Sequence, residues 1–159
     1  MFLYTQTRPV AARHEEPKPG GFIIESKDSL SRALLCVRVA VEYKGRHPVV
    51  LKVSEMSSFS DYFVIVSGRS SRQVTGIVEH IERKCREEGF RPIGIEGKQE
   101  GQWVLMDFGD VIVHVFYDPV REFYDLESLW SEAQQIELEP ELRASEYQVA
   151  EAHEEATIQ

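Results

Sequence analysis

The stretch WVLMDFGDVIVHVF, residues 103–116, decides the fold of this chain. Gly109 and Asp110 suit the two central positions of a type II′ turn, since glycine adopts the positive φ that the first position requires. The turn predicts a β-hairpin in which Phe108 lies opposite Val111. Because directly opposed residues share a face of a sheet, this pairing assigns every side chain of the hairpin to one of two faces.

The two faces of the predicted hairpin differ in chemistry. The first face is apolar throughout and should pack in the core; its pairs are Phe108 with Val111, Met106 with Val113, and Val104 with Val115. The second face is mixed, and its pairs are Trp103 with Phe116, Leu105 with His114, and Asp107 with Ile112. Burial would take Asp107 and His114 away from water, so we expect this face to be exposed, with Trp103 and Phe116 as an aromatic anchor for a partner protein. The alternative is a second layer of helix over it.

Apolar periodicity predicts the other elements, which are helices over residues 29–45 and 74–89, strands over 49–53, 62–66 and 93–95, and a last short helix over 126–133. The unit from the second strand through the second helix to the third strand is expected to form a right-handed parallel crossover. With the hairpin, these elements predict an α/β fold: a mixed sheet of about five strands with helices mainly on one face.

The chain has 159 residues, which favours one domain with tails. Residues 1–25 hold three prolines and two glycines without an apolar period, so they predict a flexible leader. Residues 134–159 hold seven glutamates against one arginine and predict an acidic flexible tail. The domain between them, residues 26–133, has no basic face for phosphate backbones, so we expect no direct nucleic-acid specificity.

The sequence predicts no metal or cofactor site. The five histidines lie far apart and lack metal-ligand spacing with Cys36 or Cys85, which lie in apolar stretches and are expected to be reduced core residues. Reduced cysteines favour the cytoplasm, and no apolar run is long enough for a membrane helix. The Gly68–Arg72 turn could cradle a phosphate with its backbone amides, although capping of the following helix is the simpler interpretation.

Five segments of the chain resemble the Iojap family, the ribosomal silencing factors: FSDYFVIVSG (59–68), SSRQV (70–74), GIEG (94–97), the hairpin (103–116) and REFYDLESLW (121–130). They occur in the family's order. The resemblance implies a nucleotidyltransferase-like fold without catalytic carboxylates, and therefore a protein that is not an enzyme. It also implies binding to the large ribosomal subunit through its ribosomal protein number fourteen. Binding there would block association with the small subunit and repress translation under nutrient limitation.

The resemblance also suggests which residues bind the partner. Trp103 matches the family's exposed tryptophan, and Asp107, Phe108 and His114 fall in its hairpin motif. With Leu105 and Phe116 added, which the register places on the second face, the expected contacts are Trp103, Leu105, Asp107, Phe108, His114 and Phe116. For Phe108 the two interpretations differ, because the register places it on the core side whereas its position beside the turn would let it reach a partner. Three alternatives stay open: a nucleotidyltransferase-like enzyme using the Gly68–Arg72 turn, an interaction module with some other partner, and a homodimer of the free protein through its exposed face.

Overall fold

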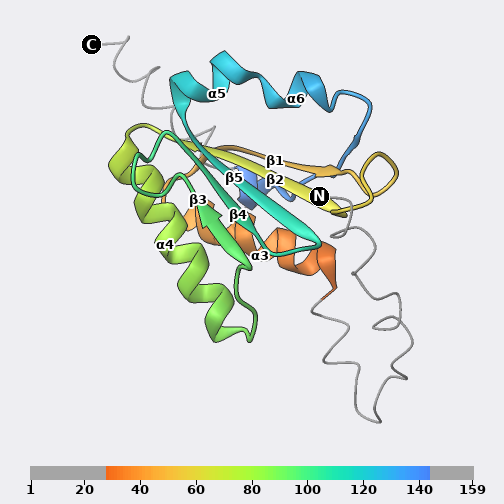
Figure 1. Ribbon diagram of the computed structural model, residues 1–159, viewed down its shortest axis with the longest axis horizontal. Coiled ribbons are helices and arrows are strands. Elements are labelled where there is room, and N and C mark those ends of the chain that lie inside the picture. The colour runs from red at the N-terminus through yellow and green to blue at the C-terminus, as the bar shows by residue number, and fades with distance from the viewer. Residues whose placement is uncertain (1–27, 144–159) are drawn as a thin grey trace.

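The computed structural model describes residues 28–143, so the predicted leader (1–25) and residues 144–159 of the predicted tail lie outside the described residues. The described part contains a six-stranded mixed sheet in the order β3-β4-β5-β2-β1-β6 (Figure 1). The strands are β1 (Arg46–Lys52), β2 (Tyr62–Gly68), β3 (Gly94–Glu96), β4 (Trp103–Asp107), β5 (Val111–Tyr117) and β6 (Gln134–Gln135). Strands β2 and β5 are parallel neighbours, and the other described pairs are antiparallel.

Helices cover both faces of the sheet. The two long helices, α3 (Ser29–Glu42) and α4 (Ser71–Glu87), lie on one face, and the short helices α5 (Asp118–Tyr124) and α6 (Leu126–Leu129) lie over the other (Figure 1). Asp28 and Ser70 cap the long helices, accepting hydrogen bonds from the backbone N–H groups of Ser31 at 2.7 Å and Gln73 at 3.1 Å. None of the described helices is long and apolar enough to cross a membrane.

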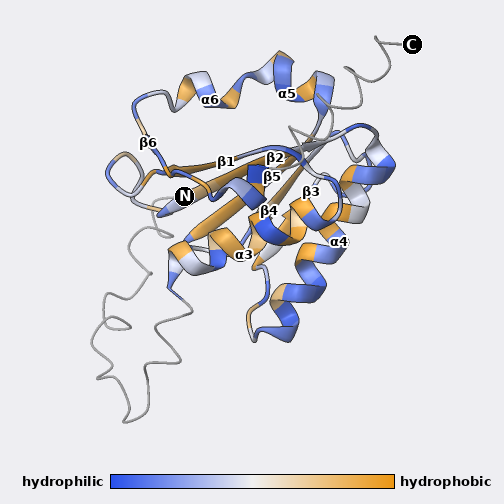
Figure 2. Ribbon diagram, turned by 180° about the vertical axis from the view of Figure 1, so that it is seen from behind, coloured by the Kyte–Doolittle hydropathy of each residue, from blue (hydrophilic) through white to orange (hydrophobic). Residues whose placement is uncertain are grey.

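The larger core lies between α3, α4 and the sheet, and Figure 2 shows apolar residues along the central strands. It contains the whole first face of the hairpin: Val104, Met106, Phe108, Val111, Val113 and Val115 are all buried. Cys36 and Cys85 are also buried here as free cysteines, with their sulfur atoms 3.9 Å apart. The predictions for the first face and for the cysteines as core residues are confirmed.

The expected crossover from β2 through α4 joins β2 to a parallel strand, β3, although the two strands are not neighbours in the sheet. Strand β3 runs in the same direction as β2, but β4 and β5 lie between them. The parallel partner of β2 is β5, a seven-residue strand with five buried residues, whereas β3 has three residues and none buried. The strand with more apolar surface to bury takes the central place, and the short exposed strand is left at the edge.

The prediction of a free tail from residue 134 is wrong for residues 134–143. Strand β6 pairs with β1, and the N–H of Ile136 donates a hydrogen bond to the carbonyl of Val50 at 2.8 Å. Leu138 and Leu142 are buried in the larger core. Two leucines among glutamates make an apolar pattern too short to predict docking from the sequence.

The last predicted helix is shorter in the structure than expected. The expected helix over residues 126–133 is only α6, which ends at Leu129. Asp125 stands at its N-terminus in a left-handed conformation, with φ 45°, and its side chain makes no capping bond. Helix α5 had not been predicted. It has seven residues, none of them buried, so it produces no apolar period in the sequence.

Candidate partner-binding surface

The β4–β5 hairpin has the predicted register. The N–H of Phe108 donates to the carbonyl of Val111 at 2.9 Å, and Gly109 has a φ of 88°. Opposed pairs on the second face are Trp103 with Phe116, Leu105 with His114, and Asp107 with Ile112. The division of the hairpin into two faces is therefore confirmed.

The expected exposure of the second face is wrong for two of its residues. Phe116 is fully buried, and only 4% of His114 is exposed. Both lie under the layer formed by α5, α6 and the following turn, where Phe116 belongs to a smaller core with Phe63 and Leu126. The alternative of a second helical layer applies here, and neither Phe116 nor His114 is placed to touch a partner in this conformation. The sequence does not predict this cover because α5, which has no buried residue, leaves no apolar stripe in it.

Along β4, the second face remains partly open. Burial alternates along this strand, with Trp103, Leu105 and Asp107 half-buried and the residues between them buried. Asp107 Oδ1 accepts a hydrogen bond from the N–H of Gly109 at 2.7 Å, so this carboxylate also stabilises the hairpin turn. The stripe of three half-buried side chains is the part of the predicted contact surface that solvent reaches.

Trp103 lies at the border between the smaller core and solvent. Its indole stacks on the ring of Phe116 with centroids 4.8 Å apart and an angle of 29°, and the ring of Tyr124 lies 4.9 Å away. Its Nε1 donates a hydrogen bond to His114 Nδ1 at 3.1 Å. The polar atom of the indole is therefore satisfied inside the protein.

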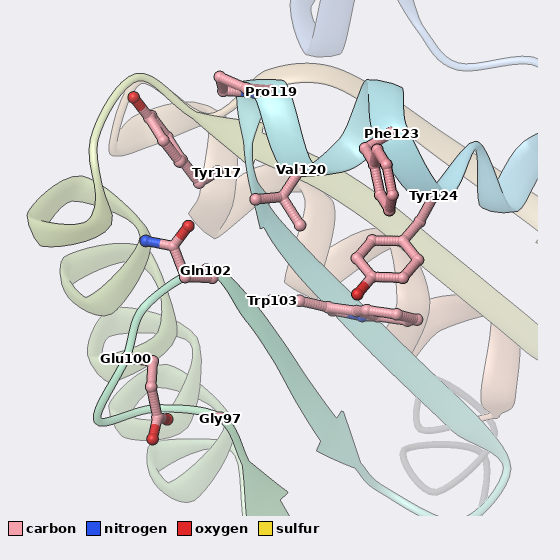
Figure 3. Close-up of a pocket in the computed structure, with 9 residues that line it drawn as sticks. All are labelled: Gly97, Glu100, Gln102, Trp103, Tyr117, Pro119, Val120, Phe123 and Tyr124. Carbon is pink, nitrogen blue, oxygen red and sulfur yellow. The ribbon is translucent and has the colours of Figure 1, made fainter.

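A groove of about 550 Å³ opens beside Trp103, between α5 and the loop that precedes β4 (Figure 3). In Figure 3 the ring of Tyr124 lies over the indole of Trp103. Phe123 is 81% exposed and Tyr124 is 51% exposed, so two aromatic rings of α5 stand largely in solvent at this site. The groove is lined by Gly97, Glu100, Gln102, Trp103, Tyr117, Pro119, Val120, Phe123 and Tyr124. Of these residues, the sequence predicts only Trp103 as a contact. Phe123 and Tyr124 lie in the family-like segment 121–130, but no sequence pattern there predicts that their rings are exposed.

Phe108 lies on the core side, as the register predicts. It is 7% exposed, and its ring packs edge-to-face against Phe90 with centroids 5.6 Å apart. Its role as a contact residue stays a prediction.

The Gly68–Arg72 turn serves as a helix cap. The N–H of Arg69 donates to Gln73 Oε1 at 2.7 Å, and the side-chain amide of Gln73 donates in turn to the carbonyls of Tyr43 and Lys44. The chain's own side chains thus occupy amides that a phosphate would need.

Within residues 28–143, no group of three or more His, Cys, Asp or Glu side chains is placed to hold a metal ion.

The profile of a protein family described as "Ribosomal silencing factor during starvation" matches residues 26–159. The chain belongs to this family. The match includes residues 134–143, in agreement with their docking onto the core of this silencing-factor domain.

Individual relatives agree with this assignment. The chain is 37% identical to "Ribosomal silencing factor RsfS" of Halalkalibacterium halodurans, over 66% of this chain and 90% of the relative. It is 32% identical to "Mitochondrial assembly of ribosomal large subunit protein 1" of Mus musculus, over 61% of this chain and 44% of the relative. A crystal structure of a Chromobacterium violaceum protein superimposes with a TM-score of 0.64 at 34% identity, covering 65% of this chain and 87% of that one.

Proposed function

We propose that this protein is a ribosomal silencing factor that binds the large ribosomal subunit through ribosomal protein number fourteen. Bound there, it would sterically block association with the small subunit and repress translation under nutrient limitation. Family membership supports the silencing role, and the name of the mouse relative refers to the large subunit. The mechanism is steric, so it requires neither catalysis nor a cofactor, and it would operate in the cytoplasm.

The observation that carries the proposal is the aromatic groove beside Trp103. Exposed aromatic rings on a rigid support are typical of binding hot spots, because they bury much surface and lose little conformational entropy. Phe123 and Tyr124 supply such rings, and Trp103 is held on a strand of the sheet. The half-buried Leu105 and Asp107 continue the same surface along β4, and the carboxylate of Asp107 complements a basic ribosomal surface.

Sedimentation of separated ribosomal subunits tests the proposal. At saturating protein, we expect this chain to sediment with the large subunit and to reduce the amount of joined ribosomes. Unchanged formation of joined ribosomes would contradict the proposal. The same experiment on the protein alone measures whether the exposed groove instead pairs two copies of the free chain.

Two exposed apolar residues provide a matched pair of variants. Phe123 lines the groove, whereas Leu129 on α6 is 73% exposed and does not line it. Neither side chain is buried, so truncation should leave folding intact. Phe123→Ala should weaken binding to the large subunit by about 1 kcal/mol or more, and Leu129→Ala should leave it unchanged. Equal effects of the two substitutions would argue against the groove as the interface.

A further inference from the structure

His114 is a buried polar side chain that contacts the groove only through Trp103. With 4% of its surface exposed, the imidazole does not reach a protein bound in the groove. Its Nδ1 accepts the hydrogen bond from the indole Nε1 at 3.1 Å. Trp103 itself is half-buried and lines the groove (Figure 3).

The hydrogen bond determines which tautomer of His114 is present. An indole nitrogen can only donate, so Nδ1 is unprotonated and the neutral ring carries its proton on Nε2. Burial lowers the pKa of His114 from 6.5 to about 4, which keeps the ring neutral near pH 7. Nε2 is buried and has no hydrogen-bond partner within residues 28–143. His114 therefore holds Trp103 with one nitrogen and leaves the other nitrogen's N–H unpaired.

The surroundings of His114 would suit a phenyl ring better than an imidazole. Phe63 lies edge-to-face at 5.1 Å, and Phe116 lies nearly parallel at 6.2 Å, with an angle of 15°. Among aromatic rings an unpaired N–H is unfavourable, and a phenyl ring would not have one. What the imidazole adds at this position is the acceptor for the Trp103 indole.

We infer that His114 is a positioning residue for partner binding, holding the Trp103 indole with Nε1 turned inward and its hydrocarbon toward the groove. This inference rests on the proposed function. A ring held in its binding orientation before the partner arrives loses less conformational freedom on binding. Loss of one neutral hydrogen bond corresponds to a weakening of about three- to tenfold.

Two substitutions of His114 separate ring shape from hydrogen bonding. His114→Phe keeps a ring and removes the acceptor, whereas His114→Asn keeps an acceptor near the position of Nδ1. Binding to purified bacterial large ribosomal subunits is measured for both. We expect His114→Phe to bind about three- to tenfold more weakly, and His114→Asn to recover part of that loss. Full binding by a folded His114→Phe chain would overturn the inference.

A second background tests whether His114 acts through the indole. Trp103→Phe removes the indole N–H, so His114→Phe should have no further effect on binding in that background. A loss of the same size in both backgrounds would overturn the inference, because a general structural defect would not depend on the indole. Loss of binding by Trp103→Ala beside an unaffected His114→Phe chain overturns this inference alone. Full binding by Trp103→Ala instead overturns the proposed interface.

The free protein provides a readout that does not require the ribosome. In ¹H–¹⁵N NMR spectra, His114→Phe should shift the indole N–H resonance of Trp103 and speed its exchange with deuterium. The indole of Trp130 serves as an internal reference in the same spectrum. An unmoved and equally protected Trp103 resonance would overturn the inference.

Discussion

The two faces of the β4–β5 hairpin are covered in different ways. On the first face, every side chain lies beneath α3 and α4. On the second face, cover is uneven: His114 and Phe116 of β5 are buried, whereas Ile112 of β5 and all three residues of β4, Trp103, Leu105 and Asp107, are half-buried. Helix α5 follows β5 directly and packs against β5 and β2, and it reaches β4 through the ring of Tyr124 over Trp103, so β4 is covered only in part. A candidate binding surface arises where the second helical layer stops.

The largest effect should come from truncating the covered part of the second face. Phe116→Ala should destabilise the protein by about 3 to 5 kcal/mol, because the ring is fully buried beneath the indole of Trp103. Chemical denaturation measures this change. A loss below about 1 kcal/mol would mean that the ring is exposed in solution and that the two faces differ more than the structure indicates.

Acid should weaken the same layer through His114. Burial lowers the pKa of His114 to about 4, so between pH 6.5 and about 4 the unfolded chain takes up a proton that the folded chain does not. Stability should therefore fall as pH decreases through this window, by on the order of 3 kcal/mol in total. Because carboxylates titrate nearby, the quantity to measure is the difference between the denaturation curves of this chain and His114→Phe. Parallel pH profiles would contradict the buried neutral imidazole.

The larger core beneath the first face also includes residues that follow residue 133. Leu142→Ala should cost about 2 kcal/mol, since this leucine closes the larger core. Deleting residues 134–159 should lower Tm more than deleting residues 144–159 does. Equal melting temperatures for the two deletions would show that residues 134–143 do not contribute to the core.

The smallest expected effect concerns the far end of β4. Asp107→Asn keeps an oxygen that can accept from the N–H of Gly109 while removing the charge. Binding to the large subunit should weaken by about 0.2 to 1 kcal/mol, and the difference should shrink as salt is raised. A salt-independent loss would mean that the turn, rather than the charge, is affected.

The features that could be predicted from the sequence depend on local rules. The Gly109-Asp110 turn determines the hairpin register, and Asp28 caps α3 through contacts within one helical turn. The features that were not predicted depend on contacts between distant segments. Helix α5 has no apolar stripe because none of its residues is buried. Leu138 and Leu142 are buried in the larger core after strand β6 pairs with β1, and the sequence does not predict that pairing.

For the candidate site too, the sequence predicts what local alternation determines and misses what depends on tertiary contacts. Alternation along the hairpin identified Trp103, Leu105 and Asp107 as one stripe on β4. The same alternation placed His114 and Phe116 on that face but could not show that α5 and α6 cover them. Exposure of Phe123 and Tyr124 follows from the tertiary position of α5, because sequence spacing alone does not distinguish an exposed aromatic ring from a buried one.

We expect the first face of the hairpin to stabilise the fold and the half-buried side chains of β4 to bind the ribosome. The most direct test measures thermal unfolding and large-subunit binding for Trp103→Ala and Val113→Ala side by side. Trp103→Ala should lose about 2 kcal/mol or more of binding, roughly thirtyfold in affinity, and remain folded. Val113→Ala should lose roughly 1 to 3 kcal/mol of stability and bind normally once folded. A Trp103→Ala chain that unfolds, beside a Val113→Ala chain that stays stable and loses binding, would mean that the roles of the two faces are reversed.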